Sequence, residues 1–388
     1  MSIRLLAKTG LASLLRYGGL HALSRSLGRS TPLVLGYHMV VDDVRAYEGR
    51  AVPANLISVR MLERQLDWIG RRYRFVSPDE LGARIEQEES SARPAAVVTF
   101  DDGYVGVYDH AFPLLRRKGI PAGVFVVTDT VGRPQLHLYD KLYLLLTHTL
   151  PVLRYSADRV KMLLEKQNIV IPLRDLSQAV KDADTLMRRL FTTLPQKRLR
   201  RAIQALEAVS DIDEREQRHL HSMTWDMIAA LDRAGMTIGS HTGTHALLTL
   251  ETGRLIAHQT AGSALMLQRM LGKPTRHFAY PDGRFNADVV DAVAAAGYRF
   301  AYTTCSHRDS RYPRLTIPRT LLWEKGCLDA WGRFSPSLMS YCTSPVSRYL
   351  SPCRQNHGSN DVRLPRAARG RASSHPWPAP IQMERGEC

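Results

Sequence analysis

From Thr31 onward the sequence alternates short apolar runs with longer segments of helical periodicity, and this alternation is the strongest constraint on the fold. It is typical of parallel strands joined by crossover helices. The apolar runs are rich in Val, Ile, Phe or Tyr, end at polar residues or Gly, and have the length of buried strands. The predicted strands are 32–37, 95–100, 122–128, 236–239, 277–280 and 300–303. The sequence therefore predicts an α/β fold built on a parallel sheet.

Helical patterns fill the gaps between these runs. The segment 58–71, for example, places Leu62, Leu66 and Ile69 on one face of a helix. The predicted helices are 58–71, 77–88, 108–118 and 286–297. Between 139 and 222 the alternation stops and only helical patterns follow, which predicts a helical insertion. The helices predicted within it are 157–166, 174–194 and 196–209.

Composition separates the two ends of the chain from the α/β unit, which we expect to cover residues 31–335. Residues 343–388 are rich in Arg, Ser, Pro and Gly with almost no apolar periodicity, which predicts a disordered tail. Residues 1–30 form a basic amphipathic segment. The formal charge is +16, and the two ends together supply nine of these sixteen charges. Because the excess lies at the ends and no zinc-finger or RNA-binding signature is present, we expect no nucleic-acid partner.

The N-terminal segment has two interpretations. Residues 3–26 mix leucines with scattered cations, which suits peripheral contact with the inner face of a membrane and suits equally a surface helix packed on the domain. Lys8 and Arg16 bracket only seven residues, too few for a secretory signal, so we expect a cytoplasmic protein. The five cysteines are odd in number and form no C-x-x-C pair, so no disulfide framework is predicted.

The first group of chemically informative residues is Thr99-Phe100-Asp101-Asp102-Gly103, in which two carboxylates follow a buried strand. Like charges this close raise one another's pKa unless a cation neutralises one of them. A metal on one carboxylate and a base role for the other is consistent with the pattern. A solvated Asp-Asp-Gly turn is the alternative, and this motif alone leaves both open.

The second group also follows a predicted strand. His241 and His245 are four residues apart, a spacing that puts both imidazoles on one face of a helical turn and is common among metal ligands. One carboxylate and two histidines leave coordination positions free for water and substrate, as a hydrolytic metal site requires. The alternative is a pair of surface histidines beside a Gly-Ser turn.

Together these motifs resemble those of the NodB-type polysaccharide deacetylases, T-F-D-D-G and H-[ST]-x-x-H, and the resemblance covers residues 32–330. It implies a distorted (β/α) barrel with fewer than eight regular strands. It also implies that Asp101 is the general base and that a divalent metal, most often Zn²⁺, is held by a carboxylate and two imidazoles. These ligands are Asp102, His241 and His245.

A third family motif, Phe-Arg-Pro-Pro-Tyr-Gly, appears here in altered form as Phe278-Ala279-Tyr280-Pro281-Asp282-Gly283. Ala279 replaces the customary Arg, and Arg284 or Arg319 is a candidate to supply the missing guanidinium. Asp282 replaces the customary Tyr, whose backbone N–H helps to hold an oxyanion, and a backbone N–H survives a change of side chain. The residues expected at the substrate and oxyanion are Tyr280, Pro281, Asp282, Gly283 and Arg319.

The segment Val34-Leu35-Gly36-Tyr37-His38 resembles the Tyr-His first strand of one branch of the same family. This resemblance implies that His38 is the general acid, with His307 as the second candidate. The implied reaction is amide hydrolysis of an N-acetylated amino sugar in a polysaccharide or glycoconjugate. Asp101 takes a proton from water, and His38, as an imidazolium, protonates the departing amine.

Two alternatives remain open. One keeps the chemistry and changes the substrate to a lipid-linked or nucleotide-linked amido sugar, with the apolar residues 142–145 forming a lip for a lipid carrier. The other is a degenerate, non-catalytic carbohydrate-binding barrel, which the altered third motif favours. A serine hydrolase fits less well, because His241 stands where a nucleophile elbow requires Ser.

Overall fold

The computed structural model describes residues 32–87, 93–344, 353 and 355–358. The basic N-terminal segment 1–30, and with it the predicted amphipathic helix of residues 3–26, lies outside the described residues, as does most of the predicted tail 343–388. Among the helices that the structure describes, none combines the length and apolarity needed to cross a bilayer.

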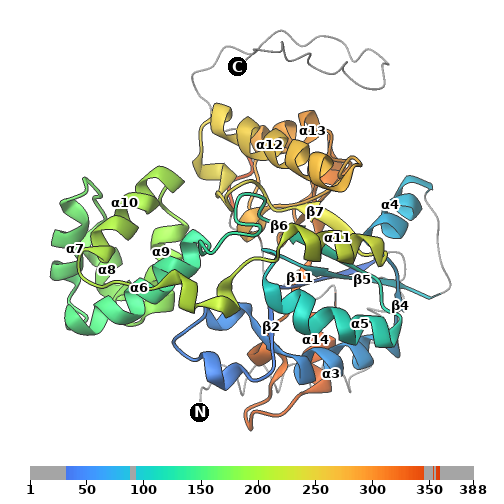
Figure 1. The fold of residues 1–388 in the computed structure, drawn as a ribbon, viewed down its shortest axis with the longest axis horizontal. Helices are drawn as coiled ribbons and strands as arrows, with labels where there is room; N and C mark the ends of the chain where they lie inside the picture. Colours follow the sequence, from blue (N-terminus) through green and yellow to red (C-terminus); the bar gives the residue numbers. More distant parts are fainter. Residues whose placement is uncertain (1–31, 88–92, 345–352, 354, 359–388) are drawn as a thin grey trace.

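The centre of the fold is a parallel sheet (Figure 1). Its strands follow the order β10-β9-β8-β7-β6-β5-β1-β11. Its strands are β1 (Leu33–Tyr37), β5 (Ala95–Phe100), β6 (Ala122–Val126), β7 (Thr237–Ser240), β8 (His277–Ala279), β9 (Phe300–Thr303), β10 (Ile317–Pro318) and β11 (Thr320–Leu321). The short β4 (Arg74–Phe75) pairs additionally with β5. All six predicted strands are confirmed to within two residues at each end.

The two ends of the sheet meet at Arg319. This residue alone separates β10, which pairs with β9, from β11, which pairs with β1. Its N–H donates to Thr303 O at 2.7 Å, and the N–H of Leu322 donates to Gly36 O at 2.9 Å. One short segment therefore pairs with both ends of the sheet and nearly closes a (β/α) barrel, which confirms the predicted fold class. Apolar periodicity missed β4, β10 and β11 because each has only two residues.

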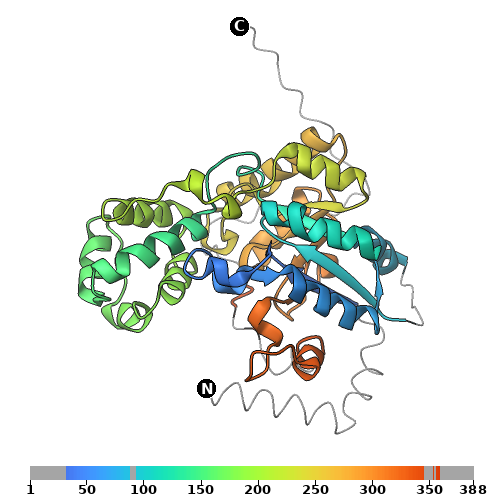
Figure 2. The same ribbon diagram turned by 60° about the horizontal axis from the view of Figure 1, so that its bottom comes forward.

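Helices surround the sheet: α3 (Val59–Gly70), α4 (Pro78–Gln87), α5 (Phe112–Lys118), α11 (Trp225–Arg233), α12 (Gly253–Leu271), α13 (Ala287–Ala295) and α14 (Pro336–Cys342) (Figures 1 and 2). Helix α3 begins because the hydroxyl of Ser58 accepts a hydrogen bond from the N–H of Met61 at 3.1 Å. Its predicted apolar face, Leu62, Leu66 and Ile69, is buried against the sheet. The predicted helix 108–118 is a π-helical turn followed by α5.

Between β6 and α11 lie the five helices of the insertion, and both views show them to one side of the barrel (Figures 1 and 2). They are α6 (Leu138–Val152), α7 (Ala157–Glu165), α8 (Leu173–Ala179), α9 (Ala183–Phe191) and α10 (Gln196–Glu207). The predicted single helix 174–194 is wrong, because Asp182 accepts a hydrogen bond from the N–H of Thr185 and starts α9 as a new helix. The apolar residues 142–145 are buried in the core that these helices share, so they form no exposed lip.

Part of the stretch predicted to be disordered packs on the barrel. The N–H of Ala287 donates to His357 O at 3.2 Å, and the N–H of Phe285 donates to the side-chain oxygen of Gln355 at 3.4 Å. At Cys353 and residues 355–358 the structure therefore differs from the prediction for 343–388. These contacts are made by backbone groups and single polar side chains, which leave no apolar periodicity in the sequence.

Two glycines give a test of the packing. A methyl group at Gly106 would lie 2.2 Å from the carbonyl oxygen of Val40 in β2 (Met39–Val41), a backbone atom that cannot move aside. We expect Gly106→Ala to lower the free energy of unfolding by about 1–3 kcal/mol. Gly262→Ala is the control: no heavy atom lies within 4 Å and the position is inside α12, so a gain of about 0.5–1 kcal/mol is expected. Denaturant unfolding that shows equal effects would contradict this packing.

Candidate active site

The predicted site residues converge at the carboxyl ends of the strands, the face on which (β/α) barrels carry their active sites. Asp101 and Asp102 follow β5, and His241 follows β7. The N–H of Asp101 donates to Tyr37 O at 2.9 Å, which brings the end of β5 beside His38 at the end of β1. The sharp turns that aim these residues need left-handed backbone at Asp102 (φ 69°) and His245 (φ 57°).

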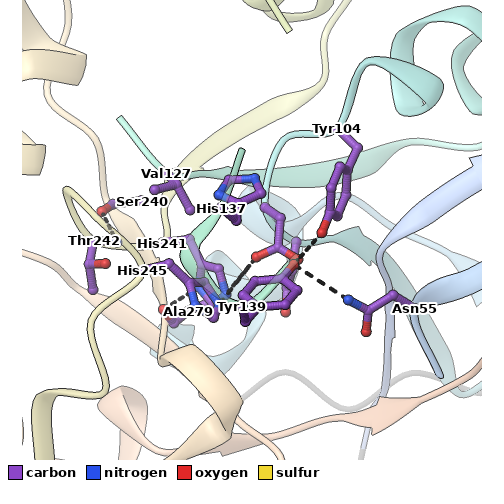
Figure 3. Close-up of polar contacts among 12 residues, drawn as sticks. Asn55, Tyr104, Val127, His137, Tyr139, Ser240, His241, Thr242, His245 and Ala279 are labelled. Carbon is purple, nitrogen blue, oxygen red and sulfur yellow. Dashed lines mark hydrogen bonds and ion pairs between the residues drawn. The ribbon is translucent and has the colours of Figure 1, made fainter. Parts of the chain in front are cut away.

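Asp102, His241 and His245 form one buried cluster. The Nε2 atoms of His241 and His245 lie 3.5 Å and 3.2 Å from Asp102 Oδ1. Figure 3 shows both imidazoles and the Tyr139 ring gathered around one point. Asp102 is only 1% exposed, and its Oδ1 receives no hydrogen bond from the residues that the structure describes. A buried carboxylate oxygen without a donor, facing two imidazole nitrogens, fits a bound cation.

The groups around this cluster orient its ligand atoms. His241 Nδ1 lies 2.7 Å from Ala279 O, so Nδ1 carries the proton and Nε2 presents its lone pair (Figure 3). The Tyr139 hydroxyl donates to Asp102 Oδ2 at 2.7 Å. Burial and then the charge of Asp101 raise the pKa of Asp102, whereas burial lowers the pKa of His241 and His245. Neutral imidazoles and a carboxylate that needs a cation are the donor set that a divalent metal requires.

Asp101 is held by a guanidinium that closes the barrel. Arg319 Nη1 donates to Asp101 Oδ1 at 2.7 Å and Nη2 donates to Oδ2 at 2.6 Å, and both residues are buried. Burial alone would raise the pKa of Asp101, but the charge and hydrogen bonds of Arg319, together with two nearby imidazoles, outweigh it and lower this pKa to about 2. Arg284, the other sequence candidate, pairs instead with Asp282 at 2.9 Å.

The two candidate acids occupy different places. His38 lies beside Asp101, Arg319 and His241, and burial lowers its pKa to about 4 in spite of the Asp101 charge. A pKa of about 4 favours the neutral imidazole at pH 7 in the resting site, and the role of His38 as the general acid stays a prediction. His307 stacks on His357 with ring centroids 4.2 Å apart and belongs to a separate cluster.

The third motif contributes backbone rather than side chains. The Tyr280 hydroxyl donates to Leu315 O at 2.8 Å inside the core. The side chain therefore points away from the ligand cluster, in contrast to its predicted place at the substrate. The N–H groups of Tyr280 and Gly283 donate to Tyr302 O and Tyr280 O. Pro281 has no N–H, so among residues 280–283 only Asp282 keeps a backbone N–H without an acceptor in the described part of the chain.

Comparison with known proteins agrees with this geometry. The model of the family described as polysaccharide deacetylase matches residues 88–169 and 184–301, about half of the chain. The chain belongs to the polysaccharide deacetylase family. YxkH of Bacillus subtilis (strain 168), whose name places it among polysaccharide deacetylases, is 18% identical over 243 residues, which are 62% of this chain and 56% of that relative. The match therefore spans little more than half the length of this curated relative.

Solved structures show the same fold. The Streptococcus pyogenes deacetylase PplD, solved in complex with acetate, is 17% identical with a TM-score of 0.50, over 81% of this chain and 98% of that one. IcaB from Ammonifex degensii is 20% identical with a TM-score of 0.49, over 81% and 97% of the two chains. These structures bear on the fold alone, whereas membership of the family supports deacetylation of a polysaccharide.

No pattern in the sequence predicted one wall of this candidate site. Tyr139 contacts Asp102, and Phe191 of α9 stacks on His245 with ring centroids 5.7 Å apart. The Tyr104 hydroxyl donates to Asp140 Oδ2 at 2.6 Å and contacts the Tyr139 hydroxyl (Figure 3). These residues lie on the helices between β6 and β7 or on the turn after β5, and no spacing in the sequence pairs them with the motifs.

Removal of the Arg319 charge provides a test with a defined pH dependence. Arg319→Gln leaves Asp101 buried without its cation, so the free energy of unfolding at pH 7 should fall by about 3–5 kcal/mol. Arg284→Gln, which removes a partly exposed guanidinium, should cost no more than about 1 kcal/mol.

The sign of this effect follows from the pKa of Asp101. In the parent the lowered pKa adds stability above the unfolded value of about 4, and this is lost as pH falls through about 2. In Arg319→Gln burial raises the pKa, so stability is instead lost as pH rises above about 4. Denaturant unfolding should thus show a larger deficit at pH 7 than at pH 4. A deficit independent of pH would contradict the assigned ion pair.

The Tyr139 hydroxyl generates a second prediction. Tyr139→Phe removes the hydrogen bond to Asp102 Oδ2, so metal affinity measured by chelator competition should fall about 10-fold to 100-fold. Tyr298→Phe is the matched control, because it removes a buried hydroxyl that donates to Thr260 O away from the site. Equal affinities of Tyr139→Phe and the parent would show that this contact does not orient Asp102.

Proposed function

We propose that the chain is a metal-dependent hydrolase that removes N-acetyl groups from an amino sugar in a polysaccharide or glycoconjugate. The observation that carries the proposal is that two adjacent carboxylates have different partners. Asp101 is bound by Arg319 and ionised, whereas Asp102 faces two imidazole nitrogens. Paired carboxyl groups with pKa values shifted in opposite directions are characteristic of a base beside a ligand or an acid.

In this proposal Asp102, His241 and His245 hold a divalent ion of the zinc class. Such an ion, when bound, supplies Lewis-acid chemistry that makes water more acidic and a carbonyl group more electrophilic. The carboxylate oxygen and two neutral imidazole nitrogens leave open positions, as catalytic zinc sites do and structural ones do not.

The remaining steps belong to residues of the chain. Arg319 keeps Asp101 ionised, and Asp101 takes a proton from the attacking water while the water oxygen bonds to the acyl carbon. The free N–H of Asp282 donates to the oxyanion that develops. His38 is neutral at rest and lies beside Asp101, so it relays the proton from Asp101 to the departing nitrogen as the C–N bond breaks. The products are acetate and a free amino sugar.

Two observations bear on the alternatives. The degenerate barrel was favoured by the loss of Arg at position 279, but Arg319 supplies a guanidinium to Asp101. The lipid-linked substrate drew on an apolar lip at 142–145, and these residues are buried. A cytoplasmic location at the inner membrane face remains a proposal that rests on residues 3–26 of the sequence.

Substitution of single carboxylates tests the proposal. Asp101→Asn should retain the metal but lower acetate release from N-acetylglucosamine oligomers and polymers by about 10²-fold to 10⁴-fold, because the base is lost. Asp102→Asn should lose both the metal held with His241 and His245 and the activity. Asp226→Asn, an exposed position on α11, is the control and should keep both. Full acetate release by Asp101→Asn, or none by the metal-loaded parent on any N-acetylated sugar, would contradict the proposal.

A further inference from the structure

A second cluster of metal-binding side chains lies beyond β9, apart from the Asp102 cluster. Cys305 follows β9, and Cys353 and His357 come from the segment that packs on the barrel. His357 Nε2 lies 3.1 Å from Cys353 Sγ and 3.5 Å from Cys305 Sγ. The three ligand atoms lie within 4.8 Å of one another, and Cys305 is only 5% exposed.

Backbone groups orient all three side chains. His357 Nδ1 lies 3.0 Å from Phe285 O, so Nδ1 carries the proton and Nε2 presents its lone pair to the two sulfurs. The N–H of His307 donates to Cys305 Sγ at 3.2 Å, and the N–H of Gln355 donates to Cys353 Sγ at 3.4 Å. These hydrogen bonds fix the positions of the two sulfur atoms. Burial raises the pKa of Cys305, so a bound cation is what would hold this buried sulfur as the thiolate that binds metals.

We propose that Cys305, Cys353 and His357 bind a second divalent ion of the zinc class. Two thiolates and a neutral imidazole balance the charge of a divalent ion, and this soft donor set differs from the oxygen and nitrogen donors at Asp102. The ion fastens Cys353 and residues 355–358 to the barrel, and water takes the fourth position. This proposal does not depend on the proposed catalytic function.

The position of this site suggests what it stabilises. The N–H of Cys305 donates to the Thr303 hydroxyl at 3.1 Å, and that hydroxyl donates to Gly283 O at 2.5 Å. On the other side, the segment that bears His357 contacts Phe285 and Ala287. The Cys305 side therefore reaches the turn 281–283 through Thr303, and the His357 side holds the residues that directly follow this turn, so the ion ties together the two segments that flank the free Asp282 N–H.

Zinc stoichiometry in the full chain tests the proposal. After reduction, chelation and reloading with Zn²⁺ alone, elemental analysis should find about two equivalents in the parent and about one in Cys353→Ser and in His357→Gln. Asp102→Asn should also retain about one, and Cys342→Ser, which changes a cysteine outside the cluster, should retain about two. With Co²⁺ in place of Zn²⁺, a thiolate charge-transfer band should appear in the parent and in Asp102→Asn and be absent from Cys353→Ser.

Three results would overturn the second site. One is a single equivalent in the parent that disappears in Asp102→Asn, and another is an unchanged stoichiometry in Cys353→Ser and His357→Gln. The third is an unreduced parent that is about 2 Da lighter than its sequence mass with Cys305 and Cys353 joined, and that takes up no second ion after reduction. A zinc content that does not fall in Asp102→Asn but does fall in Cys353→Ser and His357→Gln would instead contradict the catalytic metal. The two proposals therefore fail separately.

Discussion

The ion pair between Arg319 and Asp101 links the segment that nearly closes the sheet to the carboxylates at the carboxyl ends of the strands. The backbone of Arg319 links the strand that pairs with β9 to the strand that pairs with β1, and its guanidinium binds Asp101 through two hydrogen bonds. A buried carboxylate cannot stay ionised without such a partner. Arg319 therefore reaches Asp101 only when both ends of the sheet have paired, and the ionised state of Asp101 depends on that pairing.

The same pair separates the roles of two neighbouring carboxylates. Burial raises the pKa of both Asp101 and Asp102, but only Asp101 faces a guanidinium, so only its pKa falls. Asp102, beside the charge of Asp101, then requires a different cation. The left-handed backbone at Asp102 turns its carboxylate toward His241 and His245.

Sequence patterns predicted the strands and motifs that are formed by contiguous residues. The six longer strands, and the motifs that follow β5 and β7, could be located from sequence because each is a contiguous run with its own periodicity or spacing. Arg319 could be named only as one of two candidates, since its contact with Asp101 spans 218 residues. Tyr139 and Phe191 could not be found at all, because their contacts with the site arise from tertiary packing that leaves no spacing in the chain.

Helices α6 to α10 share a hydrophobic core that extends to β2 and Tyr104 but is distinct from the cluster inside the barrel, and Phe191 of α9 stacks on His245. Substitutions within that separate core can shift the aromatic wall of the site without touching Arg319 or Asp101. The shape of this wall can therefore change from outside the sheet while the ion pair that closes the barrel keeps its place.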